Sequence, residues 1–186
     1  LPIVLSELGA SAGLNLLWDR YALTARGQTH GPQAPALTLT PDWTGPPPPS
    51  AAPKVIARRG VDLNPPDPVA DRQRLLAYLW ADQPDRIART RAAVDLAEKL
   101  KHPVDRGDAG DWLDTRLANR HEGALHLVFH TIAWQYFPKA TRRRALAGHV
   151  ADEEAEHAVG RVERVVEIAA DLARGIHQRV HLPRLL

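Results

Sequence analysis

The sequence predicts an α/β fold with a Rossmann-like, open, mainly parallel sheet and flanking helices. The segment 1–7 reads as a buried parallel-type strand, and 125–134 suits a strand that is covered on both faces. A second core-like strand is expected within 54–62, carried by Val55, Ile56 and Ala57. Helical patterns separate these runs, as expected when crossover connections join parallel strands. Glycines and an acidic residue close the first run, as in the nucleotide site of a doubly wound domain. We therefore expect 1–7, 54–58 and 125–133 to be parallel neighbours in one sheet with an exposed edge.

Composition narrows the classes of function. At 186 residues, with 44% hydrophobic and 25% charged residues, the chain can form one domain with a real core. No apolar run approaches the roughly 20 residues that cross a bilayer, and no signal peptide is evident, so we expect a cytoplasmic protein without a membrane partner. The absence of cysteine excludes disulfides and thiolate metal sites. The net charge is only +2 and the basic residues are scattered, so no nucleic-acid partner is expected.

The chain begins inside a predicted strand and contains no Met, which indicates a fragment of a longer protein. We expect two parts. Residues 1–139 form the incomplete Rossmann-like domain, and 140–186 form a helical tail.

The first elements follow from local patterns. A short helix is expected over 12–20, after the glycine-rich turn. Residues 21–24 and 37–40 resemble a pair of strands joined by a polar turn that contains glycines. The proline run at 46–53 predicts an extended surface connection to the second core strand.

Beyond the second core strand, three prolines make 62–68 a rigid loop. Apolar spacing predicts a helix from about Val69, and a second helix starts near Pro84 and runs to about Lys101. A short strand and turn at 103–109 and a helix of about two turns precede the third apolar run.

Apolar residues in the tail follow a 3.6-residue period opposite a charged face, which predicts one amphipathic helix across roughly 151–180. This helix would cover the sheet, or else dock on another chain or a missing domain. Its apolar residues are Val159, Val162, Val166, Ala169, Ala173, Ile176 and Val180.

Four unusual segments follow the predicted strands, at the edge of an open α/β sheet where ligands bind. They are 7–13, 58–67, 107–109 and 134–136. Because the carboxyl ends of parallel strands lie at one edge, these segments are expected to converge on one site.

Three carboxylates in these segments each have a binding and a structural interpretation. Glu7 could bind a ligand ammonium or fix the glycine turn. Asp62 could accept both hydroxyls of a ribose or cap a turn, and Asp108 could meet an adenine amino group or cap a helix. The predicted cofactor-binding residues are Glu7, Gly9, Ala10, Ser11, Gly13, Asp62 and Asp108.

Gln135 and Tyr136 are candidates for orienting a substrate, or are only rim residues.

No metal site is expected. His126 and His130 are about 13 Å apart along a strand, too far for one ion. Glu154 and His157 lack the second Glu-x-x-His copy that a helical metal site needs.

The spacing E-x-G-x-S-x-G over 7–13 places Ser11 where a dinucleotide-binding fingerprint has its middle glycine. It resembles the first motif of S-adenosylmethionine-dependent methyltransferases, which holds the amino-acid end of the cofactor. The resemblance implies S-adenosylmethionine as cofactor and a methyltransferase-type activity. The alternative is a non-catalytic nucleotide-binding or scaffold protein, and an NAD(P)-dependent oxidoreductase is disfavoured by Ser11.

Several longer blocks together resemble a bacterial family catalogued as domain of unknown function 2332, over about residues 1–138. These blocks are 7–17, 58–68, 80–86, 107–109 and 128–136. The resemblance implies a methyltransferase-like Rossmann relative, with no established reaction or substrate.

Two departures from the methyltransferase pattern stand out. The carboxylate after the second strand usually lies about twenty residues past the glycine turn. Asp62 lies 55 residues beyond Glu7, so an insertion must separate them. The segment 134–136 is also not a standard catalytic signature.

Overall fold

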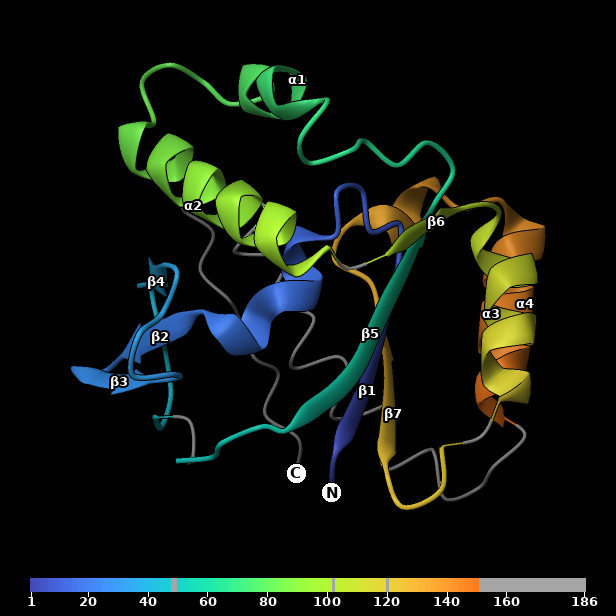
Figure 1. The fold of residues 1–186 in the computed structure, drawn as a ribbon. Helices are drawn as coiled ribbons and strands as arrows, with labels where there is room; N and C mark the ends of the chain where they lie inside the picture. Colours follow the sequence, from blue (N-terminus) through green and yellow to red (C-terminus); the bar gives the residue numbers. More distant parts are fainter. Residues whose placement is uncertain (48–49, 102, 120, 151–186) are drawn as a thin grey trace.

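The computed structural model describes residues 1–47, 50–101, 103–119 and 121–150, with only the backbone described for 146–150. Its main feature is a four-stranded parallel sheet in the order β6-β5-β1-β7 (Figure 1). The strands are β1 (Ile3–Leu8), β5 (Val55–Asp62), β6 (Val104–Arg106) and β7 (Leu125–Phe129). The predicted fold class and the three parallel neighbours are confirmed. The predicted tail helix lies outside the described residues.

β1 is the centre of this sheet and is buried on both faces. Ile3 pairs with Val55 and Leu125 on its two neighbours, and Glu7 pairs with Gly60 and Phe129. Alternate side chains point to opposite faces of a strand. Leu8 accordingly belongs to an apolar cluster with α3 and α4, whereas Leu5 packs with residues of the 3₁₀ helix that follows the strand.

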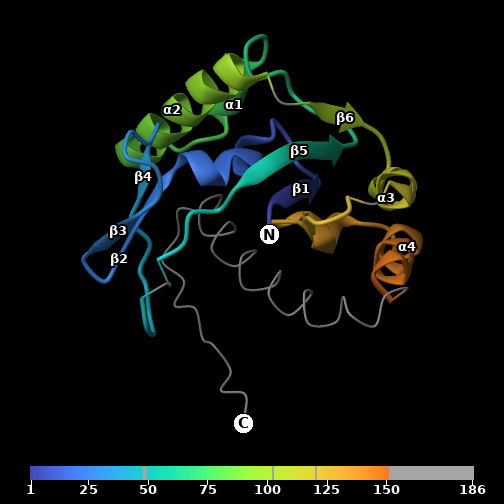
Figure 2. The ribbon, with the colours of Figure 1, turned by 60° about the horizontal axis from the view of Figure 1, so that its bottom comes forward.

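Helices cover both faces of the sheet. α3 (Ala109–Ala118) and α4 (Lys139–Val150) pack side by side on one face (Figure 2). The 3₁₀ helix η1 (Leu14–Arg20) and α2 (Pro84–Leu100) lie on the other. α1 (Arg72–Ala77) packs against α2, and the 3₁₀ turn η2 (Ala133–Tyr136) follows β7. No helix within the described ranges is both long and apolar enough to cross a membrane.

A second, three-stranded sheet has the order β3-β2-β4. Its strands are β2 (Ala22–Ala25), β3 (Gln28–His30) and β4 (Thr38–Leu39). The expected pairing of 21–24 with 37–40 is present, but it is parallel, and the segment expected as a turn contributes β3. Arg26 and Gly27 both have positive φ angles, 54° and 77°. A two-residue hairpin loop needs such angles, so the chain reverses directly into β3.

Two predicted elements differ in extent. The apolar run expected as a strand to residue 134 is a strand only as far as Phe129, the last residue of β7 that pairs with β1, opposite Glu7. The helix expected from Val69 begins at Arg72. Asp67 accepts the backbone N–H groups of Val69 and Ala70, which fixes a turn before the helix.

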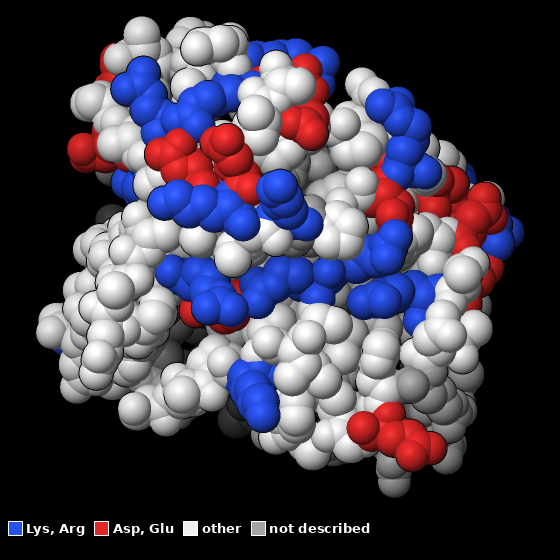
Figure 3. Space-filling view, viewed as in Figure 1, with Lys and Arg blue, Asp and Glu red and all other residues white. Residues whose placement is uncertain are grey.

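Charges of both signs share the surface in Figure 3, where basic side chains form a band across the middle and acidic ones gather above it. Several arginines are paired. Arg58 donates to Asp19 at 2.6 Å, and Arg59 binds Asp105 at 2.6 Å. These pairs tie β5 to η1 and to β6.

Candidate functional site

The turn between β1 and η1, residues 9–13, is the centre of the candidate site. Gly9, Ser11 and Gly13 all have left-handed backbones, with φ of 68°, 51° and 70°. Glycine adopts this conformation at little steric cost, whereas Ser11 adopts it as a non-glycine residue. The alternating left-handed positions reverse the chain tightly between the strand and the helix. We call this segment the glycine turn.

Hydrogen bonds join the glycine turn to the carboxyl end of β5. The N–H of Ala10 donates to the Val61 carbonyl at 3.0 Å, and the N–H of Ser11 donates to Asp62 Oδ2 at 2.9 Å. The N–H of Gly13 donates to the Ala10 carbonyl at 2.7 Å. The N–H groups of Gly9 and Ala12 have no hydrogen-bond partner among the described residues.

Asp62 holds two loops together. Besides Ser11, it accepts the N–H of Asn64 on Oδ1 at 2.9 Å. The expected turn-capping role of this carboxylate is therefore present. Each carboxylate oxygen can accept a second hydrogen bond, so capacity for a ligand hydroxyl is left.

Glu7 is a buried carboxyl that is only half satisfied. Its side chain is fully buried, and Oε1 accepts a hydrogen bond from Asn15 Nδ2 at 3.1 Å. Oε2 has no partner among the described residues. Burial raises the pKa of Glu7 to about 8, Asn15 works against this rise, and the charge of Asp62 adds to it. Glu7 is therefore mostly protonated at neutral pH.

A pocket of about 260 Å³ lies on one side of the glycine turn. Ser11 and Asn15 line it from the turn and η1, and Arg86 and Arg89 line it from α2. Leucines from α1 and the small sheet complete the wall. Glu7 and Asp62 are not among the lining residues, but each is hydrogen-bonded to a residue that is: Glu7 to Asn15 and Asp62 to Ser11.

The other side of the glycine turn is filled by η2. A Cβ added at Gly9 would lie 2.2 Å from the Cβ of Ala133, closer than two non-bonded carbon atoms can approach. Gln135 and Tyr136 follow Ala133, but their side chains are exposed and do not line the pocket; Tyr136 is 74% exposed. The predicted segments after β1 and β7 therefore meet at Gly9, while Gln135 and Tyr136 point elsewhere.

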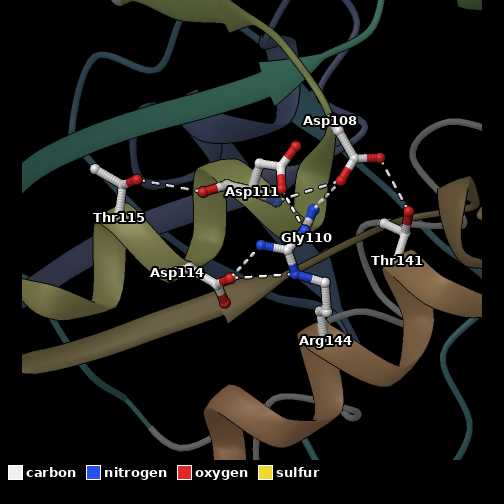
Figure 4. A network of polar contacts seen from close by, with 7 residues as sticks. All are labelled: Asp108, Gly110, Asp111, Asp114, Thr115, Thr141 and Arg144. Atoms are coloured by element: carbon white, nitrogen blue, oxygen red, sulfur yellow. Dashed lines mark hydrogen bonds and ion pairs between the residues drawn. The ribbon is translucent and has the colours of Figure 1, made fainter.

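Asp108 is used as a helix cap (Figure 4). Its Oδ1 accepts the backbone N–H groups of Gly110 and Asp111 at 2.8 and 3.3 Å, and Oδ2 accepts from the Thr141 hydroxyl at 2.9 Å. Arg144 of α4 also pairs with Asp111 of α3. The carboxylate thus starts α3 and joins it to α4, in the cluster that Figure 4 shows.

Sequence reasoning did not identify Asn15, Arg86 or Arg89. The two arginines are three residues apart, a spacing that places them on one face of a helix, but surface helices share this pattern. Asn15 becomes informative only through its contact with Glu7.

Within the described ranges, no group of three or more His, Asp or Glu residues could hold a metal ion. His126 is hydrogen-bonded to Ser6, with 2.8 Å between Nε2 and Oγ. Glu154 and His157 lie outside the described residues.

A family model described as an uncharacterized protein conserved in bacteria (DUF2332) matches residues 1–182. The predicted family is confirmed, and the match continues past residue 138 through most of the tail. No curated protein and no solved structure matches the chain.

Proposed function

The chain belongs to this DUF2332 family of bacterial proteins, and we propose that it binds S-adenosylmethionine and acts in methyl transfer. The observation that carries the proposal is Glu7. A fully buried carboxyl with one unpartnered oxygen stands at the end of the central strand, next to the glycine turn. A buried polar atom without a partner is costly, and a bound ligand that supplies the missing partner would remove that cost.

The sheet order supports the same location. β1 has β5 on one side and β7 on the other, so the chain leaves β1 in one direction and later returns on the opposite side. Open α/β sheets bind ligands outside the carboxyl ends of the strands at such a switch point. Glu7, the glycine turn and Asp62 are all at this edge.

The side chains suit the cationic end of the cofactor. Glu7 Oε2 would accept a hydrogen bond from the amino group, and Asp62 has lone pairs for the ribose hydroxyls. The free N–H of Ala12 would donate to the cofactor carboxylate. Asp108 is left out of the proposed site because its oxygens cap α3 and bind Thr141.

Bound S-adenosylmethionine supplies an electrophilic methyl group, and the protein binds and orients it. The role of Glu7 would be electrostatic. Because its pKa is about 8, Glu7 would lose a proton when an ammonium group binds beside it at neutral pH. Ligand binding should therefore release a proton.

The test is calorimetric titration of the full chain with S-adenosylhomocysteine, which keeps the amino-acid end and the ribose. We expect binding accompanied by release of close to one proton at pH 7, measured as a dependence of the heat on the buffer's ionisation enthalpy. Glu7→Gln should remove this proton release and weaken binding at least tenfold.

Glu98→Gln is the matched control, because Glu98 is exposed on α2 and does not line the site. It should bind like the wild type. Folded wild type that gives no heat at millimolar ligand would remove the methyltransferase proposal and favour the scaffold alternative.

A further inference from the structure

The pocket beside the glycine turn has a charge of one sign. Its ionisable lining groups other than Tyr21 are Arg86 and Arg89, and no acidic side chain lines it. Arg86 is positioned by Gln83, whose Oε1 accepts from Nη1 at 3.1 Å. Arg89 makes no ion pair with any described residue. The Arg89 guanidinium therefore has its hydrogen-bond donors available to a ligand.

The opposite wall of the pocket is apolar. It is built from half-buried leucines that come from two separate segments of the chain: Leu37, Leu39, Leu75 and Leu79. Leu37 and Leu39 come from the small sheet, and Leu75 and Leu79 come from α1 and the residues after it. A ligand in this pocket would have an apolar body against the leucines and a polar head at α2.

The pocket volume limits the size of that ligand. At about 260 Å³ it is slightly below the roughly 300–1,000 Å³ of typical small-molecule sites, so it suits a small organic ligand. Arginine binds carboxylate and phosphate oxygens in pairs through its planar fork of donors. Thr90, which also lines the pocket, adds a hydroxyl beside the arginines.

We propose that this pocket binds a small oxyanion with an apolar body, a medium-chain or aryl carboxylate or phosphate monoester. The oxyanion lies against Arg89 and Arg86, and the apolar body packs on the leucines. This site adjoins the proposed cofactor site at Ala10, Ser11 and Ala12, which line the pocket, whereas neither Glu7 nor Asp62 lines it. It stands whether or not the protein binds S-adenosylmethionine.

The test compares four ligands that share one eight-carbon body, titrated into the full chain: octanoate, octyl phosphate, octanol and octylammonium. We expect both anions to bind, octanol to bind at least tenfold more weakly than octanoate, and octylammonium to give no measurable binding. The ratio of the two anions shows whether carboxylate or phosphate is preferred. Binding should also shift the backbone amide signals of Arg89 and Thr90 in an NMR titration.

Arg89→Gln should weaken octanoate binding at least tenfold. Arg91→Gln is the matched control, because Arg91 is on the same helix, is exposed and does not line the pocket. Arg89→Gln should leave binding of S-adenosylhomocysteine unchanged, and Glu7→Gln should leave octanoate binding unchanged. This crossed design separates failure of this proposal from failure of the cofactor proposal.

Three results would overturn the inference. They are equal affinity for octanol and octanoate, equal losses of octanoate affinity in Arg89→Gln and Arg91→Gln, and no binding of either anion at millimolar concentration.

Discussion

The glycine turn has a closed side and an open side, and the two differ in what they require of the sequence. On the closed side, Gly9 packs against Ala133 of η2 with no room for a side chain. On the open side, Ser11 and its neighbours line a pocket. A glycine-rich turn therefore contains positions that serve packing and positions that are free to meet a ligand. The sequence pattern alone does not separate them.

The charges around the turn differ in the same way. Glu7 and Asp62 lie beneath the turn and at the end of β5, whereas Arg86 and Arg89 face the pocket. Asn15 lies between the two regions, because it donates to Glu7 and also lines the pocket. Substitution of Gly9 should therefore act on stability, and substitution of Arg89 should act on binding in the pocket.

Gly9→Ala should have the largest effect on stability. A left-handed backbone costs about 1–2 kcal/mol for a residue with a Cβ, and overpacking adds typically about 1–3 kcal/mol. We expect a loss of about 2–5 kcal/mol, measured by urea unfolding.

Gly27→Ala is the matched control for this variant. Gly27 has φ of 77°, but nothing lies within 4 Å of its added Cβ. The Gly27→Ala variant should lose only the stability that the left-handed backbone costs, about 1–2 kcal/mol. Equal losses in the two variants would show that η2 does not close this side.

The main sheet could be predicted because its signal is physical and local. β1 lies at the centre of the sheet and is buried along most of its length, so its residues form a nearly continuous apolar run, and β7 has the same character over Leu127–Phe129. The ends of strands and helices were harder to predict: the apolar run continues to Trp134, but β7 stops at Phe129, its last residue that pairs with β1. Pairing decides that position, and local propensity does not.

The roles of site residues could be predicted only as alternatives. A carboxylate suits a helix cap and a ligand equally, and the backbone N–H groups near Asp108 decide between them. The pocket was not predictable, because Asn15, Leu39 and Arg89 meet through tertiary packing and share no sequence motif. Glu7 was identified from its position after the strand, but its burial and its raised pKa follow from the packing around it.

Glu7→Gln should have the second-largest effect on the free energy of unfolding, and this effect should depend on pH. Folding raises the pKa of Glu7 from 4.5 to about 8. Between these values the folded protein keeps a proton that the unfolded chain has lost, so the contribution of Glu7 to stability falls as pH rises. At 1.36 kcal/mol per pH unit, the cost reaches about 3 kcal/mol at pH 7. Glutamine has no charge to lose, so the variant should be more stable by about that amount.

The measurement is the free energy of unfolding of both proteins from pH 4 to pH 8. The two curves should meet near pH 4 and separate steadily as the pH rises. Glu98→Gln should follow the wild type throughout. A constant difference between wild type and Glu7→Gln at every pH would contradict the assignment of a buried, protonated carboxyl.

Ser11→Gly, a substitution on the open side of the glycine turn, should have the smallest effect on stability. The Ser11 side chain is exposed, and its backbone has φ of 51°, so glycine would relieve left-handed strain. Glycine also gains freedom in the unfolded chain, which offsets part of that relief by about 0.5–1 kcal/mol. The N–H that donates to Asp62 is kept. We expect a stabilisation of about 0–1 kcal/mol by urea unfolding, with Ser11→Ala matching the wild type. A loss of more than about 1.5 kcal/mol in Ser11→Gly would mean that the serine side chain holds the turn, and the open side would then be built for packing as the closed side is.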